Sequence, residues 1–315
     1  KLYLIENCIY GVDIQPIAVQ IAKLRFFISL IIDEKKQPGK DNFGIRSLPN
    51  LETKFVAANT LIALEKQQKL VRTIPGIDKL SNQLKQLRHQ YFSAKTRKEK
   101  LQYQKQDKAL RQQIAKLLEN SGWDKGTAQQ IVQFDPYDQN VSSPFFDPEW
   151  MCGHDLKNGF DIVIGNPPYG GALSKTEIEY FKANYSLKSS ETAILFIEKG
   201  NRILQHNGIL SYIIPKSYTF ASNYTAARHF TINDLAFIVD CGKAFENVLL
   251  EATVFQIIKN KSFKYYKSIQ LIGVDFLVLA EIDKKLVDKY GLLPNGITDA
   301  EIAVADKLTA NKYYL

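Results

Sequence analysis

The sequence predicts an α/β fold with a basic helical insert, and three observations lead to this prediction. Short apolar runs of strand length recur along the chain, at residues 7–12, 54–57, 160–164, 209–214, 235–239 and 252–258. Stretches with helical periodicity separate several of these runs. The 315 residues are 45% hydrophobic and 23% charged, which is an ordinary globular composition and enough chain for one to three domains. Buried strands that alternate with helices are typical of a sheet covered on both faces.

The elements are expected in the following order. The first strand covers Asn7–Val12, and Pro16 lies in the first turn of the next helix, where proline loses no hydrogen bond. That helix extends to about Ile32. Apolar residues at helical spacing predict a further helix over 191–204. Beyond residue 259 the pattern changes to a strand-like run at 269–279 and a charged helix, which we interpret as the beginning of a second domain.

Composition and the first residues exclude several classes of protein. The most apolar stretch, residues 17–32, contains polar and charged side chains, so we expect no membrane span. The chain starts without the features of a signal peptide, and its three cysteines form no Cys-x-x-Cys pair, which suits a reducing cytoplasm. The four histidines have no metal-ligand spacing, so no metal site is predicted. Because the chain does not begin with methionine, we expect a fragment or a processed chain.

Positive charge is concentrated in one segment, residues 77–119. The whole chain has 41 Lys and Arg against 33 Asp and Glu, and this segment alone has eleven basic and four acidic residues. Apolar residues recur there at spacings of three and four, which predicts one long helix or two helices paired as a hairpin. Two interpretations stay open. The charge belongs to a solvated helical face, or it forms an arm that faces nucleic-acid phosphates, with Lys95, Arg97 and Lys98 as DNA contacts.

Three polar residues follow predicted strands: Asp13, Asn59 and Asn166. Ligands of α/β sheets bind outside the carboxyl ends of the strands. A carboxylate there can accept hydrogen bonds from both hydroxyls of a ribose, and an Asn side chain can both donate to and accept from an adenine edge. The same residue types also form turns and helix caps, so each position alone is weak evidence. Three of them together favour a functional rim.

The segment Asn166-Pro167-Pro168-Tyr169 is the most specific feature of the sequence. Two consecutive prolines fix two φ angles and remove two N–H donors, which makes the loop rigid. We expect the Asn166 amide oxygen and the Pro167 carbonyl to accept the two hydrogens of a planar amino group, while the Tyr169 ring stacks on the attached heterocycle. Such acceptors return electron density to the amino nitrogen, which then attacks a methyl donor in line. The alternative is a stiff surface turn.

These four residues resemble the catalytic motif of S-adenosylmethionine-dependent amino-methyltransferases, most of which methylate adenine N6 in DNA. Residues 9–14 resemble the second motif of that family. The resemblance implies that Asp13 holds the cofactor ribose and that Ile14 lines the cofactor adenine. Residues 58–62 resemble the third motif, which implies that Asn59 and Thr60 bind the cofactor adenine as well.

The resemblance extends beyond the cofactor motifs. Residues 142–146 and the basic insert are similar to the fused type IIG restriction–modification subfamily. Residues 207–215 resemble a later structural motif, and residues 243–248 resemble the segment whose aromatic side chain, here Phe245, stacks on the flipped target base.

The resemblance implies a Rossmann-like methyltransferase sheet that binds S-adenosylmethionine and double-stranded DNA with a flipped adenine. It divides the chain into a first core part (1–65), a basic insert and linker (66–150), a catalytic core part (151–260) and the start of a target-recognition or linker region (261–315). The family's Gly-rich first motif would lie upstream of residue 1, and many members carry a nuclease there. The rest of the target-recognition domain would lie downstream.

Four other functions compete with adenine methylation. Methylation of cytosine C5 needs a cysteine nucleophile after proline, and none of the three cysteines follows one. Protein-glutamine methyltransferases use the same Asn-Pro-Pro-Tyr, but they have no need of a segment with a net charge of +7, which a polyanionic substrate explains. Cytosine-N4 methylation is chemically equivalent and is disfavoured because that group prefers Ser at position 166. The last alternative is an inactive DNA-binding scaffold.

Overall fold

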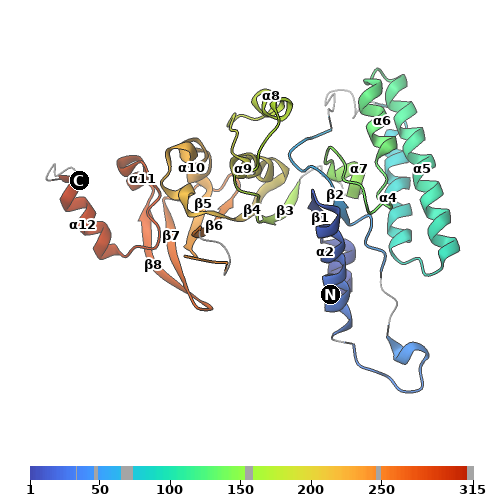
Figure 1. Cartoon of the computed structure of the whole chain (residues 1–315), viewed down its shortest axis with the longest axis horizontal. Helices are drawn as coiled ribbons and strands as arrows, with labels where there is room; N and C mark the ends of the chain where they lie inside the picture. Colours follow the sequence, from blue (N-terminus) through green and yellow to red (C-terminus); the bar gives the residue numbers. More distant parts are fainter. Residues whose placement is uncertain (33, 46–48, 65–73, 153–158, 246–249, 311–315) are drawn as a thin grey trace. The chain divides into compact units, whose positions relative to one another are not determined.

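The computed structural model describes residues 1–32, 34–45, 49–64, 74–152, 159–245 and 250–310 (Figure 1). The chain forms two compact units, Lys1–Leu156 and Lys157–Leu315. Within the described ranges, no helix combines the length and the apolar character that crossing a bilayer requires.

The first unit contains a small parallel sheet of two strands, β1 (Gly11–Asp13) and β2 (Phe55–Ala57), in which Asp13 pairs with Ala57. The predicted first strand is wrong at its beginning, because α1 (Leu2–Asn7) is helical. The reason is the spacing of the apolar residues: Leu2, Ile5 and Ile9 repeat every three or four positions and pack into one hydrophobic cluster.

Helix α2 (Pro16–Ile31) begins at its proline, as the sequence predicts. Val19 and Phe26 of this helix pack in one hydrophobic cluster with Phe55 and Ala57 of β2. The opposite stripe stays exposed in the described structure, with exposed fractions of 60% for Ile17, 53% for Ile21 and 57% for Leu24. Helix α2 carries apolar residues on two faces, and only one of them is buried in this unit.

The basic segment forms two helices rather than one, α4 (Ile77–Phe92) and α5 (Arg97–Asn120), which lie side by side as a hairpin (Figure 1). A capping box starts the second helix: the Thr96 side chain accepts from the N–H of Glu99, and the Glu99 carboxylate accepts from the N–H of Thr96. The four-residue turn before Arg97 settles the choice that the apolar spacing leaves open. Helix α6 (Lys125–Gln133) packs on α5, and α7 (Pro148–Cys152) and a short 3-10 turn (Asp41–Gly44) complete the unit.

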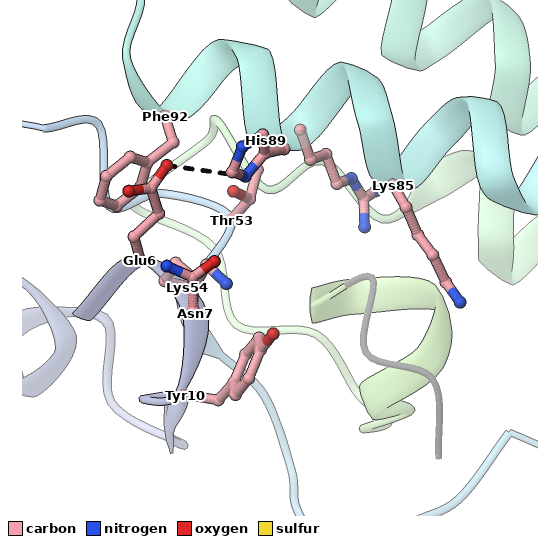
Figure 2. Close-up of a pocket in the computed structure, with 9 residues that line it drawn as sticks. Glu6, Asn7, Tyr10, Thr53, Lys54, Lys85, His89 and Phe92 are labelled. Atoms are coloured by element: carbon pink, nitrogen blue, oxygen red, sulfur yellow. Dashed lines mark ion pairs between the residues drawn. The ribbon is translucent and has the colours of Figure 1, made fainter. Parts of the chain in front are cut away.

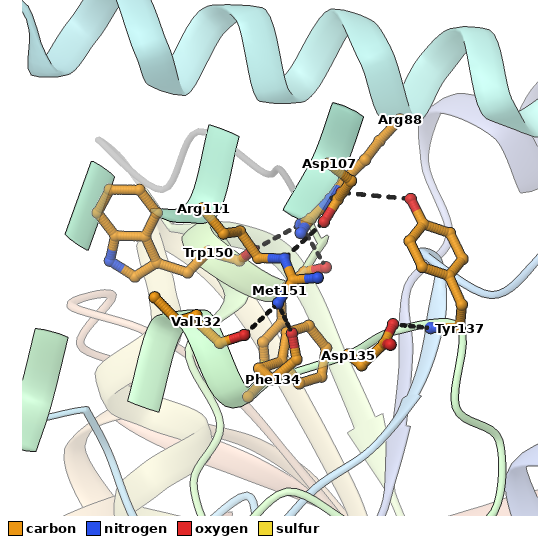
Figure 3. A network of polar contacts seen from close by, with 9 residues as sticks. All are labelled: Arg88, Asp107, Arg111, Val132, Phe134, Asp135, Tyr137, Trp150 and Met151. Carbon is orange, nitrogen blue, oxygen red and sulfur yellow. Dashed lines mark hydrogen bonds and ion pairs between the residues drawn. The ribbon is translucent and has the colours of Figure 1, made fainter. Parts of the chain in front are cut away.

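A buried ion network joins the hairpin to the rest of the first unit (Figure 3). Asp107 of α5 is fully buried and accepts from Arg88 Nε at 2.8 Å and from Arg111 Nε at 2.6 Å. Arg88 also donates to the carbonyls of Trp150 and Met151, and Arg111 donates to those of Val132 and Phe134. Two arginines of the basic segment thus serve the interior and not its surface.

The second unit is built on a mixed six-stranded sheet with the order β3-β4-β6-β5-β7-β8. The bounds are β3 (Phe160–Gly165), β4 (Leu204–Pro215), β5 (Leu235–Asp240), β6 (Ala252–Ile258), β7 (Tyr265–Ile272) and β8 (Asp275–Asp283). Strand β3 is parallel to β4, and both β4 and β5 are antiparallel to β6. Strands β3, β4 and β5 therefore run in one direction and end at one edge of the sheet.

Helices α8 (Lys175–Asn184), α9 (Thr192–Ile203), α10 (Thr225–Thr231), α11 (Lys285–Tyr290) and α12 (Asp299–Ala310) belong to this unit. Three 3-10 turns lie at Lys216–Thr219, Ser222–Tyr224 and Ile232–Asp234. The core contains Ile194 and Ile197 of α9 with Leu210 of β4 and Phe255 of β6. The strand predictions for 160–164, 209–214, 235–239 and 252–258 are confirmed.

Two expectations for the second unit need correction. The single run predicted at 269–279 is a hairpin, because Gly273 has a φ of +64° and turns the chain between β7 and β8. The sheet is not covered on both faces along its first strand: Ile162 and Ile164 of β3 are 60% and 76% exposed. Strand β3 lies at the edge of the sheet, where fewer neighbours bury its side chains.

Candidate functional site

The predicted cofactor residues of the first unit lie together at the carboxyl ends of its two strands. Asp13 ends β1, and its backbone carbonyl accepts from the N–H of Ala58, the residue before Asn59. The side chains of Asp13 and Ile14 are exposed, and those of Asn59 and Thr60 are half-buried. One carboxylate oxygen of Asp13 accepts from the N–H of Gln15 at 2.8 Å. This bond orients the carboxylate and leaves its other oxygen for a ligand.

Asn59 lies in a turn, and the segment at residues 142–146 supports this turn. Its Oδ1 accepts from the N–H of Leu61 at 3.1 Å, and its own N–H donates to the carbonyl of Ser143 at 2.9 Å. Ser143 in turn donates to the carbonyl of Ala57, so residues 142–146 run beside the end of β2. After helices α4, α5 and α6 the fold thereby returns the chain to the end of β2, beside the predicted cofactor residues.

The Asn-Pro-Pro-Tyr loop follows β3 in the second unit. Asn166 and Pro168 are exposed, Pro167 is buried and Tyr169 is half-buried. The strand ends in a glycine for a steric reason, since a Cβ on Gly165 would lie 3.0 Å from the Tyr212 ring. The Asn166 side chain therefore follows the carboxyl end of a parallel strand, the edge at which α/β sheets bind ligands.

The Tyr169 hydroxyl donates to Asn166 Oδ1 at 2.7 Å and lies 3.2 Å from the carbonyl of Ile213 in β4. Burial raises the pKa of Tyr169, so the phenol stays protonated and remains a donor. This contact was not among the sequence expectations, which gave Tyr169 only a stacking role. The phenol orients the amide oxygen of Asn166, and one side of its ring packs on the core of the unit.

A family model described as Eco57I restriction-modification methylase matches residues 7–245, three quarters of the chain and both sets of residues described above. The chain belongs to the Eco57I family. The curated proteins that it resembles are longer. The putative type II restriction enzyme and methyltransferase RM.MjaORFECS2P of Methanocaldococcus jannaschii is 25% identical over 279 residues, which cover 72% of this chain and 23% of that protein.

The adenine-specific methyltransferase BrxX of Escherichia coli is 24% identical over 297 residues, covering 86% of this chain and 23% of that protein. The chain thus spans less than a quarter of the length of these curated relatives. Among solved structures, that of the type IIL restriction-modification enzyme MmeI in complex with DNA is 10% identical and covers 90% of this chain and 35% of that chain, with a TM-score of 0.37. A TM-score of this size does not define a common fold.

Thr192, the first residue of α9, and Glu191, which precedes it, support the Asn-Pro-Pro-Tyr loop of this Eco57I-family chain, and the sequence did not single them out. The Thr192 hydroxyl donates to the carbonyl of Pro168 at 2.7 Å, and the Glu191 carboxylate accepts from the N–H of Gly170 at 3.0 Å. Both hydrogen bonds anchor the loop to the beginning of α9. Their only sequence signal is their place at the start of the helix predicted over 191–204.

Lys216 is a third residue that the sequence analysis missed. It directly follows β4, and its Nζ lies 2.9 Å from Asp240 and 2.8 Å from Glu251. Burial alone would lower the pKa of Lys216, but hydrogen bonds to Glu251 and Asp240 outweigh it and raise the pKa. The ion pairs hold both ends of the segment that contains Phe245, which is 39% exposed. Residues 246–249 of the resembling segment lie outside the described residues.

The predicted DNA contacts Lys95, Arg97 and Lys98 lie at the turn between α4 and α5, and all three side chains are exposed. Within the described segments, no three His, Cys, Asp or Glu side chains gather as a metal site would require. The structure therefore places the predicted residues in sets: the predicted cofactor residues and a basic turn in the first unit, and the Asn-Pro-Pro-Tyr loop and, on a separate segment, Phe245 in the second.

Proposed function

We propose that this Eco57I-family chain is the methyltransferase part of a restriction–modification enzyme that methylates adenine N6 in duplex DNA. The observation that carries the proposal is the Asn166 side chain, exposed at the carboxyl end of β3 and oriented by the Tyr169 hydroxyl at 2.7 Å. An amide oxygen fixed in this way is an acceptor for an amino group. Family membership supports methyl transfer, and the adenine-specific description of BrxX supports the choice of base.

The cofactor edge of the first unit fits the adenosine half of S-adenosylmethionine. The Asp13 carboxylate is exposed and has one oxygen available for ribose hydroxyls, as a carboxylate at the end of a strand provides in dinucleotide-binding folds. The exposed Ile14 side chain offers an apolar surface to the adenine. Asn59 and Thr60 follow on the neighbouring strand. When bound, the cofactor supplies an electrophilic methyl group.

Asn166 would make the target nitrogen nucleophilic. A carbonyl oxygen has two lone pairs, so Asn166 Oδ1 can accept from the adenine amino group while it keeps the bond from Tyr169. The Pro167 carbonyl would accept the second hydrogen. Tyr169 and Phe245 would stack on the adenine, which has to leave the DNA helix to reach the loop, at a cost of a few kcal/mol. Thr192 and Glu191 hold the loop during this exchange.

Protein-glutamine methylation is the competing enzymatic function, because an amide nitrogen could occupy the same acceptors. The exposed basic turn at Lys95, Arg97 and Lys98 favours a polyanion instead. A catalytically inactive scaffold is the competing non-enzymatic function, and it predicts DNA binding without cofactor binding.

The test is Asn166→Ala in the full polypeptide that contains this chain. Methyl transfer from radiolabelled S-adenosylmethionine to duplex DNA should fall about 100- to 1000-fold, since the acceptor that activates the nitrogen is lost. Cofactor binding, measured by calorimetry, should be unchanged. Asn184→Ala, at the exposed end of α8, is the matched control and should retain full activity.

Near-normal turnover of Asn166→Ala would overturn the role given to this residue. Transfer to a glutamine-containing peptide but not to DNA would replace the proposed substrate. Binding of duplex DNA by a protein that never binds the cofactor would establish the scaffold function.

A further inference from the structure

A pocket of about 200 Å³ opens in the first unit, at the end of the β1–β2 sheet opposite to Asp13 and Asn59 (Figure 2). Tyr10 and Lys54 line it, and they directly precede β1 and β2. Because the two strands are parallel, this places the pocket at their amino ends. Helix α4 contributes Lys85, Arg88 and His89 from the other side.

The charge of the lining is positive. Two lysines, Lys54 and Lys85, line the pocket together with Arg88, whose charge is paired with the buried Asp107, and the lining has a single acid, Glu6. Glu6 faces His89 at 3.6 Å, as the dashed line in Figure 2 shows. The excess of cations over carboxylates makes the pocket attractive to an anion.

Two of these cations are held in place. The Lys54 Nζ lies 4.1 Å from the centroid of the Tyr10 ring, a cation–π distance. Arg88 is 3% exposed and is fixed by Asp107 and by the carbonyls of Trp150 and Met151. A pocket with fixed cations loses little side-chain entropy when an anion binds.

The basic turn of the hairpin lies at the same end of the unit. The Asn50 side chain donates to the carbonyl of Tyr91 at 2.7 Å and to that of Ala94 at 2.8 Å. Asn50 precedes Lys54 by four residues, so these bonds tie the turn to the segment that leads into β2. The exposed Lys95, Arg97 and Lys98 follow Phe92, which lines the pocket, by three to six residues.

We propose that this pocket binds a backbone phosphate of nucleic acid, with Lys54 and Lys85 as the contacts, and that the strand continues over the turn at Lys95–Lys98. A polyanion with regularly spaced charges fits a pocket followed by a row of exposed cations better than a single carboxylate does. The proposal rests on the proposed function only in taking DNA as the partner. The contact lies at the opposite end of the strands from the cofactor edge, so it acts on DNA affinity and leaves cofactor binding unchanged.

The experiment measures the binding of a fluorescein-labelled 20-base-pair duplex by anisotropy at several salt concentrations, in the full polypeptide. Lys54→Gln combined with Lys85→Gln should reduce the slope of log affinity against log salt by about two, because each phosphate contact contributes about 0.9. The double variant should bind S-adenosylmethionine as the unmodified protein does. Lys54→Arg with Lys85→Arg keeps both charges and should retain the original slope, which separates charge loss from misfolding.

The matched control removes two lysines from the other end of the insert, Lys116→Gln with Lys125→Gln, both exposed. Lys116 lies nineteen residues along α5 from Arg97, roughly 28 Å at 1.5 Å per residue. This pair should leave the slope unchanged. An unchanged slope in the pocket variant, or an equal loss in the control pair, would overturn the inference.

Competition distinguishes the source of the phosphate. Inorganic phosphate at millimolar concentration should displace the duplex only weakly, because the turn contacts remain. Full displacement by inorganic phosphate, or by an acidic peptide but not by a second duplex, would contradict a backbone contact. The outcome does not depend on Asn166. A protein that shows no methyl transfer but does show the change in slope would contradict the proposed function and still support this inference.

Discussion

The two basic regions of the α4–α5 hairpin differ in what surrounds their charges. In the middle of the hairpin, Arg88 and Arg111 are 3% and 2% exposed and share the fully buried Asp107. At the turn, Lys95, Arg97 and Lys98 are all exposed. The first group joins helices in the interior, and the second lies on the surface, where we propose that it contacts DNA.

The comparison shows that composition overstates the charge available to a partner. The sequence counts eleven basic and four acidic residues in this segment. Two arginines and one aspartate of that count are paired with one another inside the protein. The residue types agree with their positions, since arginine donates several hydrogen bonds in a fixed geometry to carboxylates and carbonyls, whereas the ammonium group of lysine is strongly hydrated.

Removing the shared carboxylate should have the largest effect. Asp107→Ala leaves two guanidinium groups buried without their anion, and we expect the free energy of unfolding to fall by about 3–5 kcal/mol. Urea unfolding followed by circular dichroism measures this loss. The exposed Asp78, at the start of α4, is a matched control whose replacement by Ala should cost less than about 1 kcal/mol. Equal losses of unfolding free energy in the two variants would contradict the distinction between buried and exposed charges.

The pH dependence of stability should follow from the same carboxylate. Burial alone would raise the pKa of Asp107, but Arg88 and Arg111 outweigh it and lower the pKa. A lowered pKa means that the stabilisation is present above the unfolded value of about 4 and is lost as the pH falls through the folded value. The free energy of unfolding should therefore decrease on acidification below pH 4. Asp107→Asn should show a smaller decrease, and an identical profile would exclude Asp107 as a source of acid sensitivity.

Neutralising the three exposed cations of the turn should have the smallest effect on the free energy of unfolding. The property that changes should be DNA binding. Lys95→Gln, Arg97→Gln and Lys98→Gln together should change the unfolding free energy by less than about 1 kcal/mol, because exposed charges contribute little. The slope of log DNA affinity against log salt should fall by about three contacts. An unaltered slope would return the hairpin to the interpretation of a solvated helical face.

Local sequence signals determined much of the secondary structure. The strands over 160–164, 209–214, 235–239 and 252–258 and the start of α2 at Pro16 all follow from short-range patterns, since apolar runs and proline act within a few residues. The motif Asn166–Tyr169 likewise made the loop after β3 predictable. The helix α1 was missed because a short apolar run fits a strand and one turn of helix equally well.

Tertiary structure alone decided which polar groups meet. The sharing of Asp107 by two arginines, the bond from Tyr169 to Asn166, and the ion pairs of Lys216 with Asp240 and Glu251 join residues whose separation in sequence ranges from three to thirty-five positions. Residue type and spacing show that a charge exists, but its partner depends on the packing of whole elements. The sequence by itself predicted four strands of the second unit and the place of the Asn-Pro-Pro-Tyr loop after β3. Only the folded chain decided which cations are buried with a carboxylate and which are exposed, because burial and charge pairing depend on how the elements pack.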